Sequence, residues 1–128
     1  YEIEWERAAR GADGRLFPWG DTAEAAFAHL RADGRTPNRP ASIHQFPDDV
    51  SPFGVRGLAG NVRDWCADVH LAATREGQTP SSSFDRRAVR GGSFRTPLDS
   101  ARTTARASLP AGHGFIDVGF RLVRAFGR

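Results

Sequence analysis

The sequence predicts one loop-rich α+β domain. Its 128 residues suffice for a single domain, and a content of 39% apolar and 26% charged residues is typical of a globular chain. The 14 glycines and 8 prolines predict frequent turns. A helix pattern opens the chain, and short strand patterns lie in its last third. We therefore expect few regular elements, joined by long loops.

The first element predicted is a helix over Glu2–Arg10. Trp5, Ala8 and Ala9 fall on one face at helical spacing, and Gly11 supplies a stop. This helix is expected to bury its apolar face against the rest of the domain.

A turn, an aromatic loop and a second short helix follow. Residues 11–14 have turn composition, and two large rings within Phe17–Asp21 are expected to anchor a loop to the core. Either Asp21 or Thr22 is expected to cap a short helix over Ala23–Arg31.

The remaining elements are short strands and loops. Ser42–Phe46 is predicted as a short strand with Ile43 inward, whereas Gly57–Asp64 is too rich in glycine for a helix and is predicted as a structured loop. Arg75–Phe84 has the composition of a polar surface loop. The three later strand predictions are Ala88–Arg90, Ala101–Arg106 and Val118–Val123.

Charge and cysteine content limit the classes of function. The net charge is +3, and all 18 basic residues are arginine. Because 15 acidic residues accompany them and no basic block forms, the pattern disfavours nucleic-acid binding. No apolar run is long enough to cross a membrane. Cys66 is the lone cysteine, which excludes an internal disulfide and fits a reducing, cytoplasmic compartment.

Five motifs in order carry a family resemblance. They are EIEWERAARG at Glu2–Gly11, FPWGD at Phe17–Asp21, FGV…GNVRDW within Phe53–Trp65, RGGSF at Arg90–Phe94 and GFRLV at Gly119–Val123. Each is weak alone, but in this order they resemble the sulfatase-modifying-factor family, which includes the formylglycine-generating enzymes.

The resemblance implies the fold and a domain boundary. Family members have an irregular, C-type-lectin-like α+β fold, with short antiparallel strands and long loops. The helix at Glu2 normally lies well inside that domain. Residues 1–128 therefore resemble its C-terminal portion, and we expect the missing N-terminal segment of the domain to be a partner of this chain.

The chemistry of formylglycine generation is not expected here. The resembled enzymes use two cysteines after the RGGS motif to bind copper(I), for which thiolate is the natural ligand. Thr96 and Ala101 stand at the corresponding positions, and neither can supply a thiolate. Cys66 lies in a different segment and is predicted to be a small buried apolar residue. Copper is therefore not an expected cofactor.

An oxidoreductase remains an alternative. Sulfoxide synthases of ergothioneine-type pathways carry a domain of this family beside a helical domain whose histidines hold iron. The histidines of this chain show no paired metal spacing, so a complete iron site is not encoded here. The metal site of such an enzyme would lie outside this chain. The histidines are His29, His44, His70 and His113.

Calcium is the metal that the resemblance implies. Family members bind it at the Gly-Asn loop, which matches the backbone of Gly60 and Val62 and the side chain of Asp64. Gly57 replaces the usual fourth side-chain ligand and offers a carbonyl alone. The alternative is structural, with Asn61 holding the loop through side-chain hydrogen bonds.

A second family calcium site matches this chain less closely. It has an asparagine where this chain has His29, and Asp33 is the candidate for its carboxylate.

The arginines are predicted to fix loops, and Ser93 is not expected to be a nucleophile. Ser93 lacks a visible His/Asp pattern. Carboxylate pairs within the chain would stabilise a domain with little regular structure. The candidate pairs join Arg90, Arg102, Arg106 and Arg121 to Asp64, Asp68, Asp99 or Asp117.

The function that this pattern favours is recognition of a protein or small-molecule ligand. Lectin-like folds carry specificity in variable loops, and the candidate surface spans Thr74–Phe84 and Arg95–Phe115. The resemblance implies fusion to kinase, protease or other effector domains in bacteria. Another alternative is the variable binding protein of a diversity-generating retroelement. The candidate contact residues are Arg95, Arg102, Arg106 and His113.

Overall fold

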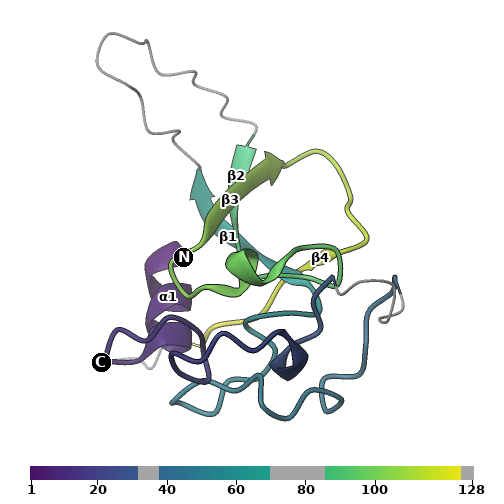
Figure 1. The fold of residues 1–128 in the computed structure, drawn as a ribbon. Helices are drawn as coiled ribbons and strands as arrows, with labels where there is room; N and C mark the ends of the chain where they lie inside the picture. Colours follow the sequence, from purple (N-terminus) through teal and green to yellow (C-terminus); the bar gives the residue numbers. More distant parts are fainter. Residues whose placement is uncertain (32–37, 70–85, 125–128) are drawn as a thin grey trace, which may run out of the picture.

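In the computed structural model, one α-helix packs beside a small curled sheet, and long loops gather below it (Figure 1). Residues 1–31, 38–69 and 86–124 are described. The helix α1 spans Glu2–Arg10, and two 3₁₀ helices span Ala25–Phe27 and Leu98–Ala101. No helix in these ranges is long and apolar enough to cross a bilayer. The α+β class is confirmed.

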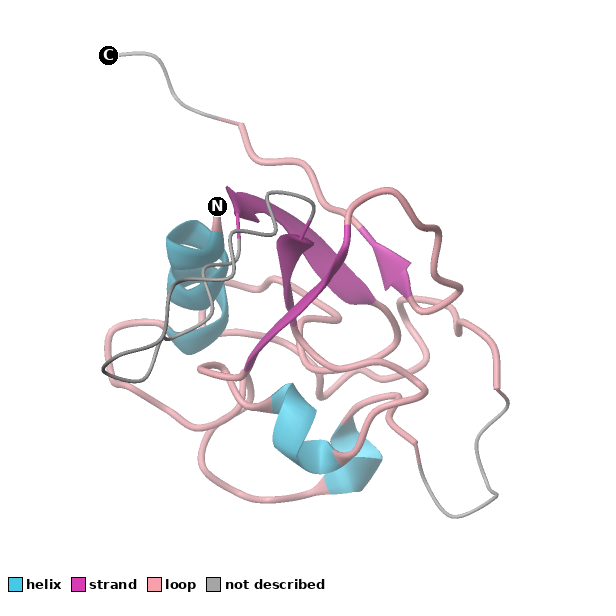
Figure 2. Ribbon diagram, turned by 90° about the horizontal axis from the view of Figure 1, so that it is seen from above, coloured by secondary structure: helices cyan, strands magenta, loops and turns pink. Residues whose placement is uncertain are grey.

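The sheet contains four strands in the order β3-β2-β1-β4. Strand β1 pairs antiparallel with β2, and β2 with β3, but β4 runs parallel to β1 (Figure 2). The expected antiparallel pairing therefore does not extend to β4. The strands span Arg63–Val69 (β1), Arg86–Arg90 (β2), Arg106–Pro110 (β3) and Val118–Gly119 (β4).

Helix α1 matches its predicted bounds, and its apolar side is buried as expected. Trp5 and Ala9 pack with Leu58, Cys66 and Ala88 in one core cluster. A second cluster lies under the loops and joins parts of the chain that are distant in sequence. Its members are Phe17, Ala28, Leu30, Ala59 and Ala101.

The predicted helix over Ala23–Arg31 is wrong. Only Ala25–Phe27 forms a 3₁₀ turn, and Ala28 is extended with φ −132° and ψ 157°. Residues 21–26 are exposed, so the segment has no apolar helix face to bury. Glu24, and not Asp21 or Thr22, caps the turn by accepting from the Ala26 N–H.

Three strand predictions need correction. Ser42–Phe46 is a turn closed by Gln45 N–H to Ser42 O, and Ile43 is exposed. Ala101 ends a 3₁₀ helix, and strand pairing starts only at Arg106. In the predicted strand Val118–Val123, only the first two residues pair. The β2 prediction is confirmed, whereas β1 was hidden by the glycine-rich loop that precedes it. The predicted loop Arg75–Phe84 lies outside the described residues.

Glycines of the GNVRDW and RGGSF motifs allow three backbone segments to lie in contact. A Cβ on Gly60 would lie 2.7 Å from the backbone N of His29, and one on Gly91 would lie 2.5 Å from Leu58 O. A Cβ on Gly92 would lie 2.8 Å from Leu30 Cδ2 and would overlap Ala59 O. The Gly-Asn loop is therefore enclosed by the 28–30 segment and the RGG turn.

A buried guanidinium joins α1 to the sheet. Arg90 is 1% exposed, and its Nη2 donates to Glu6 Oε2 over 2.7 Å and to Thr103 O over 2.9 Å. Its guanidinium also lies 5.2 Å from the Trp5 ring and 3.4 Å from Glu2. Such a buried charge is tolerated because it is paired and hydrogen-bonded.

Replacing Gly92 should test the backbone contact directly. We expect Gly92→Ala to lower the free energy of unfolding by roughly 2–4 kcal/mol, because its Cβ has no space beside Ala59 O. Gly112→Ala is the matched control, since nothing lies within 4 Å of its Cβ. Denaturant unfolding measures both, and equal stability of the two variants would contradict the packing argument.

Candidate functional site

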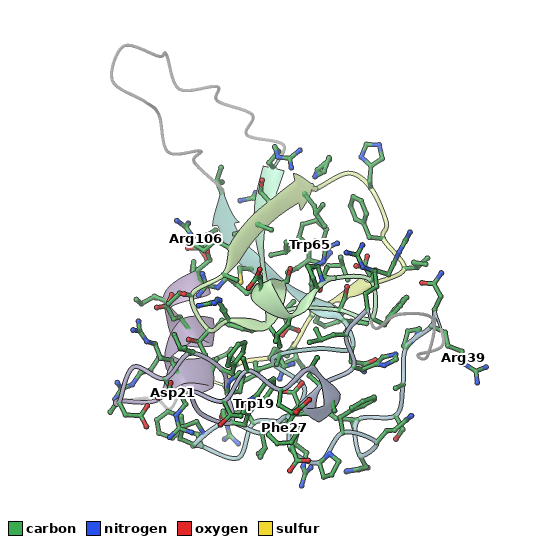
Figure 3. The ribbon with its side chains drawn as sticks, in the orientation of Figure 1. Trp19, Asp21, Phe27, Arg39, Trp65 and Arg106 are labelled. Carbon is green, nitrogen blue, oxygen red and sulfur yellow. The ribbon has the colours of Figure 1, made fainter. Side chains whose placement is uncertain are left out.

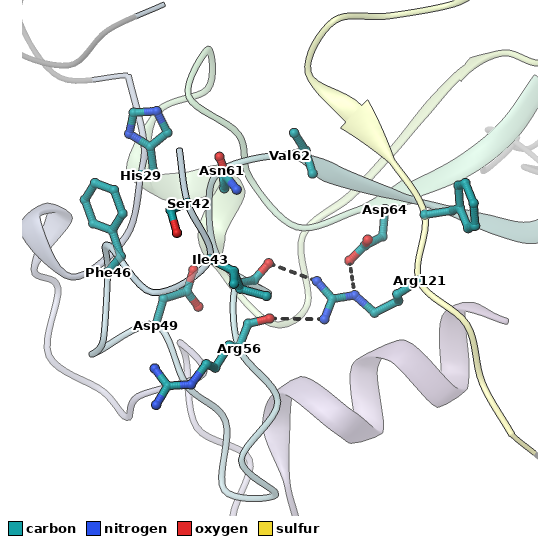
Figure 4. Close-up of a pocket in the computed structure, with 12 residues that line it drawn as sticks. His29, Ser42, Ile43, Phe46, Asp49, Arg56, Asn61, Val62, Asp64 and Arg121 are labelled. Atoms are coloured by element: carbon teal, nitrogen blue, oxygen red, sulfur yellow. Dashed lines mark hydrogen bonds and ion pairs between the residues drawn. The ribbon is translucent and has the colours of Figure 1, made fainter. Parts of the chain in front are cut away.

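A cavity of about 250 Å³ lies beside the Gly-Asn loop, which contains Gly60 and Asn61 (Figure 4). Apolar side chains contribute part of its wall, and carboxylates, an amide and guanidinium groups provide polar groups. This mixture is typical of a small-molecule pocket. The lining residues are His29, Ser42, Ile43, Phe46, Asp49, Arg56, Gly57, Asn61, Val62, Asp64, Phe120 and Arg121.

Asp49 holds the loop in place through backbone groups. Its carboxylate accepts from the N–H of Ala59 and of Gly60, both over 3.0 Å. Asp49 is 2% exposed, and burial raises its pKa to about 6 even though these hydrogen bonds oppose the shift. Pro47–Asp49 has only the composition of a turn, so no sequence motif pointed to Asp49.

Asp64 is buried at the start of β1, and one of its two carboxylate oxygens accepts from two protein donors. Its Oδ2 accepts from Trp5 Nε1 over 2.9 Å and from Arg121 Nε over 2.7 Å. Burial raises the pKa of Asp64, opposed by the neighbouring Arg121 guanidinium and the Trp5 hydrogen bond. Two other Arg121 nitrogens donate to the carbonyls of Arg56 and Gly57.

The other two predicted calcium ligands, Gly60 and Val62, precede Asp64 in the same segment. Gly60 is buried against His29, and Val62 lines the cavity. Asn61 bridges to Ala41 through both atoms of its amide, so the predicted loop-holding hydrogen bonds are present. Among residues 1–31, 38–69 and 86–124, no group of three or more His, Cys, Asp or Glu side chains could hold a metal.

His29 is buried between two aromatic rings. Its ring centroid lies 5.1 Å from that of Phe46 and 5.9 Å from that of Phe94. Nε2 lies 3.0 Å from Arg39 O and must donate there, whereas Nδ1 is buried without a partner within the described chain. Asp33 and His70 lie outside the described residues.

Thr96 and Ala101, which stand at the positions of the copper ligands, both have structural roles in this chain. Thr96 Oγ1 accepts from the Ser93 N–H over 2.8 Å and donates to Ser93 O over 3.2 Å. Ala101 is fully buried in the second core cluster. Ser93 Oγ donates to Asp117 Oδ2 over 2.7 Å, and Asp117 also binds Arg63. Ser93 is thus part of a buried support for the loop.

The four predicted ligand-contact residues differ in their surroundings: two are paired with acidic residues, and two are exposed. Arg106, at the start of β3, donates two hydrogen bonds of 2.7 and 2.6 Å to the Glu2 carboxylate (Figure 3). Arg102 lies 3.5 Å from Asp99, with its guanidinium 6.0 Å from the Phe17 ring. Arg95 and His113 are exposed on separate loops. The Thr74–Phe84 part of the surface lies outside the described residues.

Comparison with known proteins shows the family to which this chain belongs. The profile of the "Sulfatase-modifying factor enzyme 1-like domain" matches residues 1–126. The chain belongs to the sulfatase-modifying-factor family. The backbone contacts at Gly60, Gly91 and Gly92 are therefore features of a domain of this family.

Two relatives agree with this assignment, and a solved structure shares the fold. The chain is 31% identical over 121 residues to a hercynine oxygenase of Mycolicibacterium thermoresistibile, covering 82% of this chain and 26% of the relative. It is 31% identical over 115 residues to a formylglycine-generating enzyme of Thermomonospora curvata, covering 73% and 37%. The structure of CarF superposes with a TM-score of 0.71 at 22% identity, covering 98% of this chain and 46% of CarF.

The domain of this chain therefore spans less than half of each of these proteins. Their shared fold is confirmed for this chain, but a fold supports many activities. What the chain does must be argued from its own side chains.

The Asp49 carboxyl group predicts a pH-dependent stability. Its folded pKa of about 6 lies above its ordinary value of 3.8, so the folded state binds the proton more tightly. The contribution to stability is complete below about pH 4 and is lost as the pH rises through 6. Relative to Asp49→Asn, the unfolding free energy should fall by about 2 kcal/mol from pH 4 to pH 7.

Chemical denaturation across that pH range measures the difference. Asp48→Asn is the matched control, since Asp48 is exposed beside Asp49. If the wild-type chain and Asp49→Asn change in parallel with pH, Asp49 is not the group that titrates.

Proposed function

We propose that this sulfatase-modifying-factor domain acts by recognition and has no copper oxidase activity. The observation that carries the proposal is the pair Thr96 and Ala101 at the positions of the copper ligands. One side chain closes a turn, and the other fills the core. Neither offers the soft thiolate that copper(I) requires.

Cys66 does not supply a substitute thiolate. It is 7% exposed in the cluster with Trp5 and Leu58, and burial raises the pKa of its thiol to about 11. A thiol of this kind is protonated at neutral pH and is a poor nucleophile and metal ligand.

The recognition surface is proposed to centre on the exposed side chains of the 95–115 region. Arg95 and His113 make no side-chain hydrogen bond or ion pair within the described residues, so both are free to contact a ligand. Arg102 and Arg106 are held against Asp99 and Glu2 and would present only their exposed edges. A protein or small-molecule ligand would satisfy the planar donors of Arg95.

The rest of the domain is proposed to cover the apolar strip that flanks β4 on both sides in sequence. Its side chains are exposed beside the open edge of the sheet, an arrangement that normally pairs or docks with another segment. The greater length of the relatives supports a further segment as the partner. Fusion to a kinase, protease or other effector, and a retroelement-type variable binding protein, both remain compatible with recognition. The strip consists of Ile116, Phe120, Leu122 and Val123.

An oxidoreductase is the second candidate, favoured by the identity to a hercynine oxygenase. Because no metal-binding cluster is found within residues 1–31, 38–69 and 86–124, its metal ligands would have to lie outside them. Iron analysis of the complete gene product separates the candidates. Stoichiometric iron would favour the oxidoreductase, and its absence would favour a recognition domain.

Copper binding tests the first proposal. The chain, titrated with copper(I) against a competing chelator, should retain no tightly bound equivalent, because the two thiolate positions carry a hydroxyl and a methyl group. A sulfatase-type cysteine peptide should likewise remain unconverted when followed by mass spectrometry.

Cys66→Ala is the control for the remaining thiol. One equivalent of copper retained by both the wild-type chain and this variant, or conversion of the peptide, would contradict the proposal.

A further inference from the structure

Arg121 brings a positive charge to oxygen atoms of three residues (Figure 4). All three of its guanidinium nitrogens donate, to Asp64 Oδ2 over 2.7 Å, to Arg56 O over 3.1 Å and to Gly57 O over 3.0 Å. The acceptors come from β1 and from the loop before it, whereas Arg121 follows β4. A single guanidinium therefore crosslinks the loop, the sheet and the C-terminal segment.

This arrangement does not fit the calcium site that the family resemblance implies. The implied ligands are Gly57, Gly60, Val62 and Asp64, and the Gly57 carbonyl and the Asp64 carboxylate already accept from Arg121. Calcium takes six to eight oxygen ligands and favours carboxylates. Asp64 is the single carboxylate of this set, and Trp5 also donates to it.

The other carboxylate of the cavity, Asp49, is bound to the backbone of the loop. Both oxygens of Asp49 accept from the backbone N–H groups of Ala59 and Gly60. A divalent ion at Asp64 would have to displace the guanidinium or lie against it, and like charges at contact distance repel strongly where solvent is excluded.

We propose that Arg121 is the built-in cation of the Gly-Asn loop, so that the loop holds its structure without calcium. The guanidinium supplies what a bound ion would supply: one positive charge for the buried Asp64 and several directed contacts to backbone carbonyls. Because it is covalently attached, its occupancy is independent of ion concentration, unlike that of a bound ligand.

Burial explains why Asp64 requires a cation. Asp64 has 4% of its side chain exposed, against 32% for Arg121, so the guanidinium screens the carboxylate from water on the open side. Leaving a buried carboxylate without its partner is strongly destabilising. The same contacts fix the C-terminal segment, because Arg121 points inward between the exposed Phe120 and Leu122.

Calcium dependence tests the proposal on the unmodified chain. Thermal unfolding is followed in a calcium chelator and in millimolar calcium chloride, with magnesium chloride as the control for ionic strength. We expect equal midpoints in all three. A calcium-specific rise beyond the repeat error would overturn the proposal, because an ion that binds the folded state raises its midpoint.

Two matched variants test the role of the guanidinium itself. Arg121→Gln should lower the midpoint by roughly 10 °C or more, because it leaves Asp64 buried without a cation. Arg39→Gln removes the same charge from an exposed side chain that points away from the domain (Figure 3) and should change little. Equal midpoints of the two variants would overturn the proposal. If Arg121→Gln does not fold, the calcium comparison on the unmodified chain decides.

Discussion

The fold depends on three backbone segments that lie closer together than side chains would permit. The Gly-Asn loop passes between the 28–30 segment and the RGG turn, with Asn61 N–H donating to His29 O over 2.8 Å and Gly92 N–H donating to Ala59 O over 3.0 Å. These bonds belong to no helix and no strand pair, so loops and turns hold this part of the domain together. Glycine is required because any Cβ would separate the segments.

Charged side chains also hold the loops, the helix and the sheet together. Asp49 satisfies the N–H groups of Ala59 and Gly60, and Arg90 and Arg121 join α1 and the C-terminal segment to the sheet. In a domain with short strands, many backbone groups lack a partner in secondary structure, and charged side chains provide it. The abundance of arginine is thus explained in part by internal pairing.

Local patterns allowed part of this structure to be predicted. Helix α1 and strand β2 follow from apolar spacing, and the family motifs located Asn61, Val62 and Asp64 at the cavity. The helix over Ala23–Arg31 failed because the segment is extended to meet Asn61, a contact 32 residues away. Asp49 was missed for the same reason, since its partners lie ten residues further along the chain and its own surroundings signal only a turn.

The same contacts limit what the family motifs say about activity. Gly91 and Gly92 are explained by the approach of Leu58 and Ala59, and Ser93 by its bond to Asp117, so the RGGS motif is required by packing whether or not the domain catalyses a reaction. A match to that motif is therefore evidence for the fold. Evidence for catalysis must come from side chains that are not needed for packing. Here Thr96 bonds to Ser93 within a turn, and Ala101 is buried in the second core cluster.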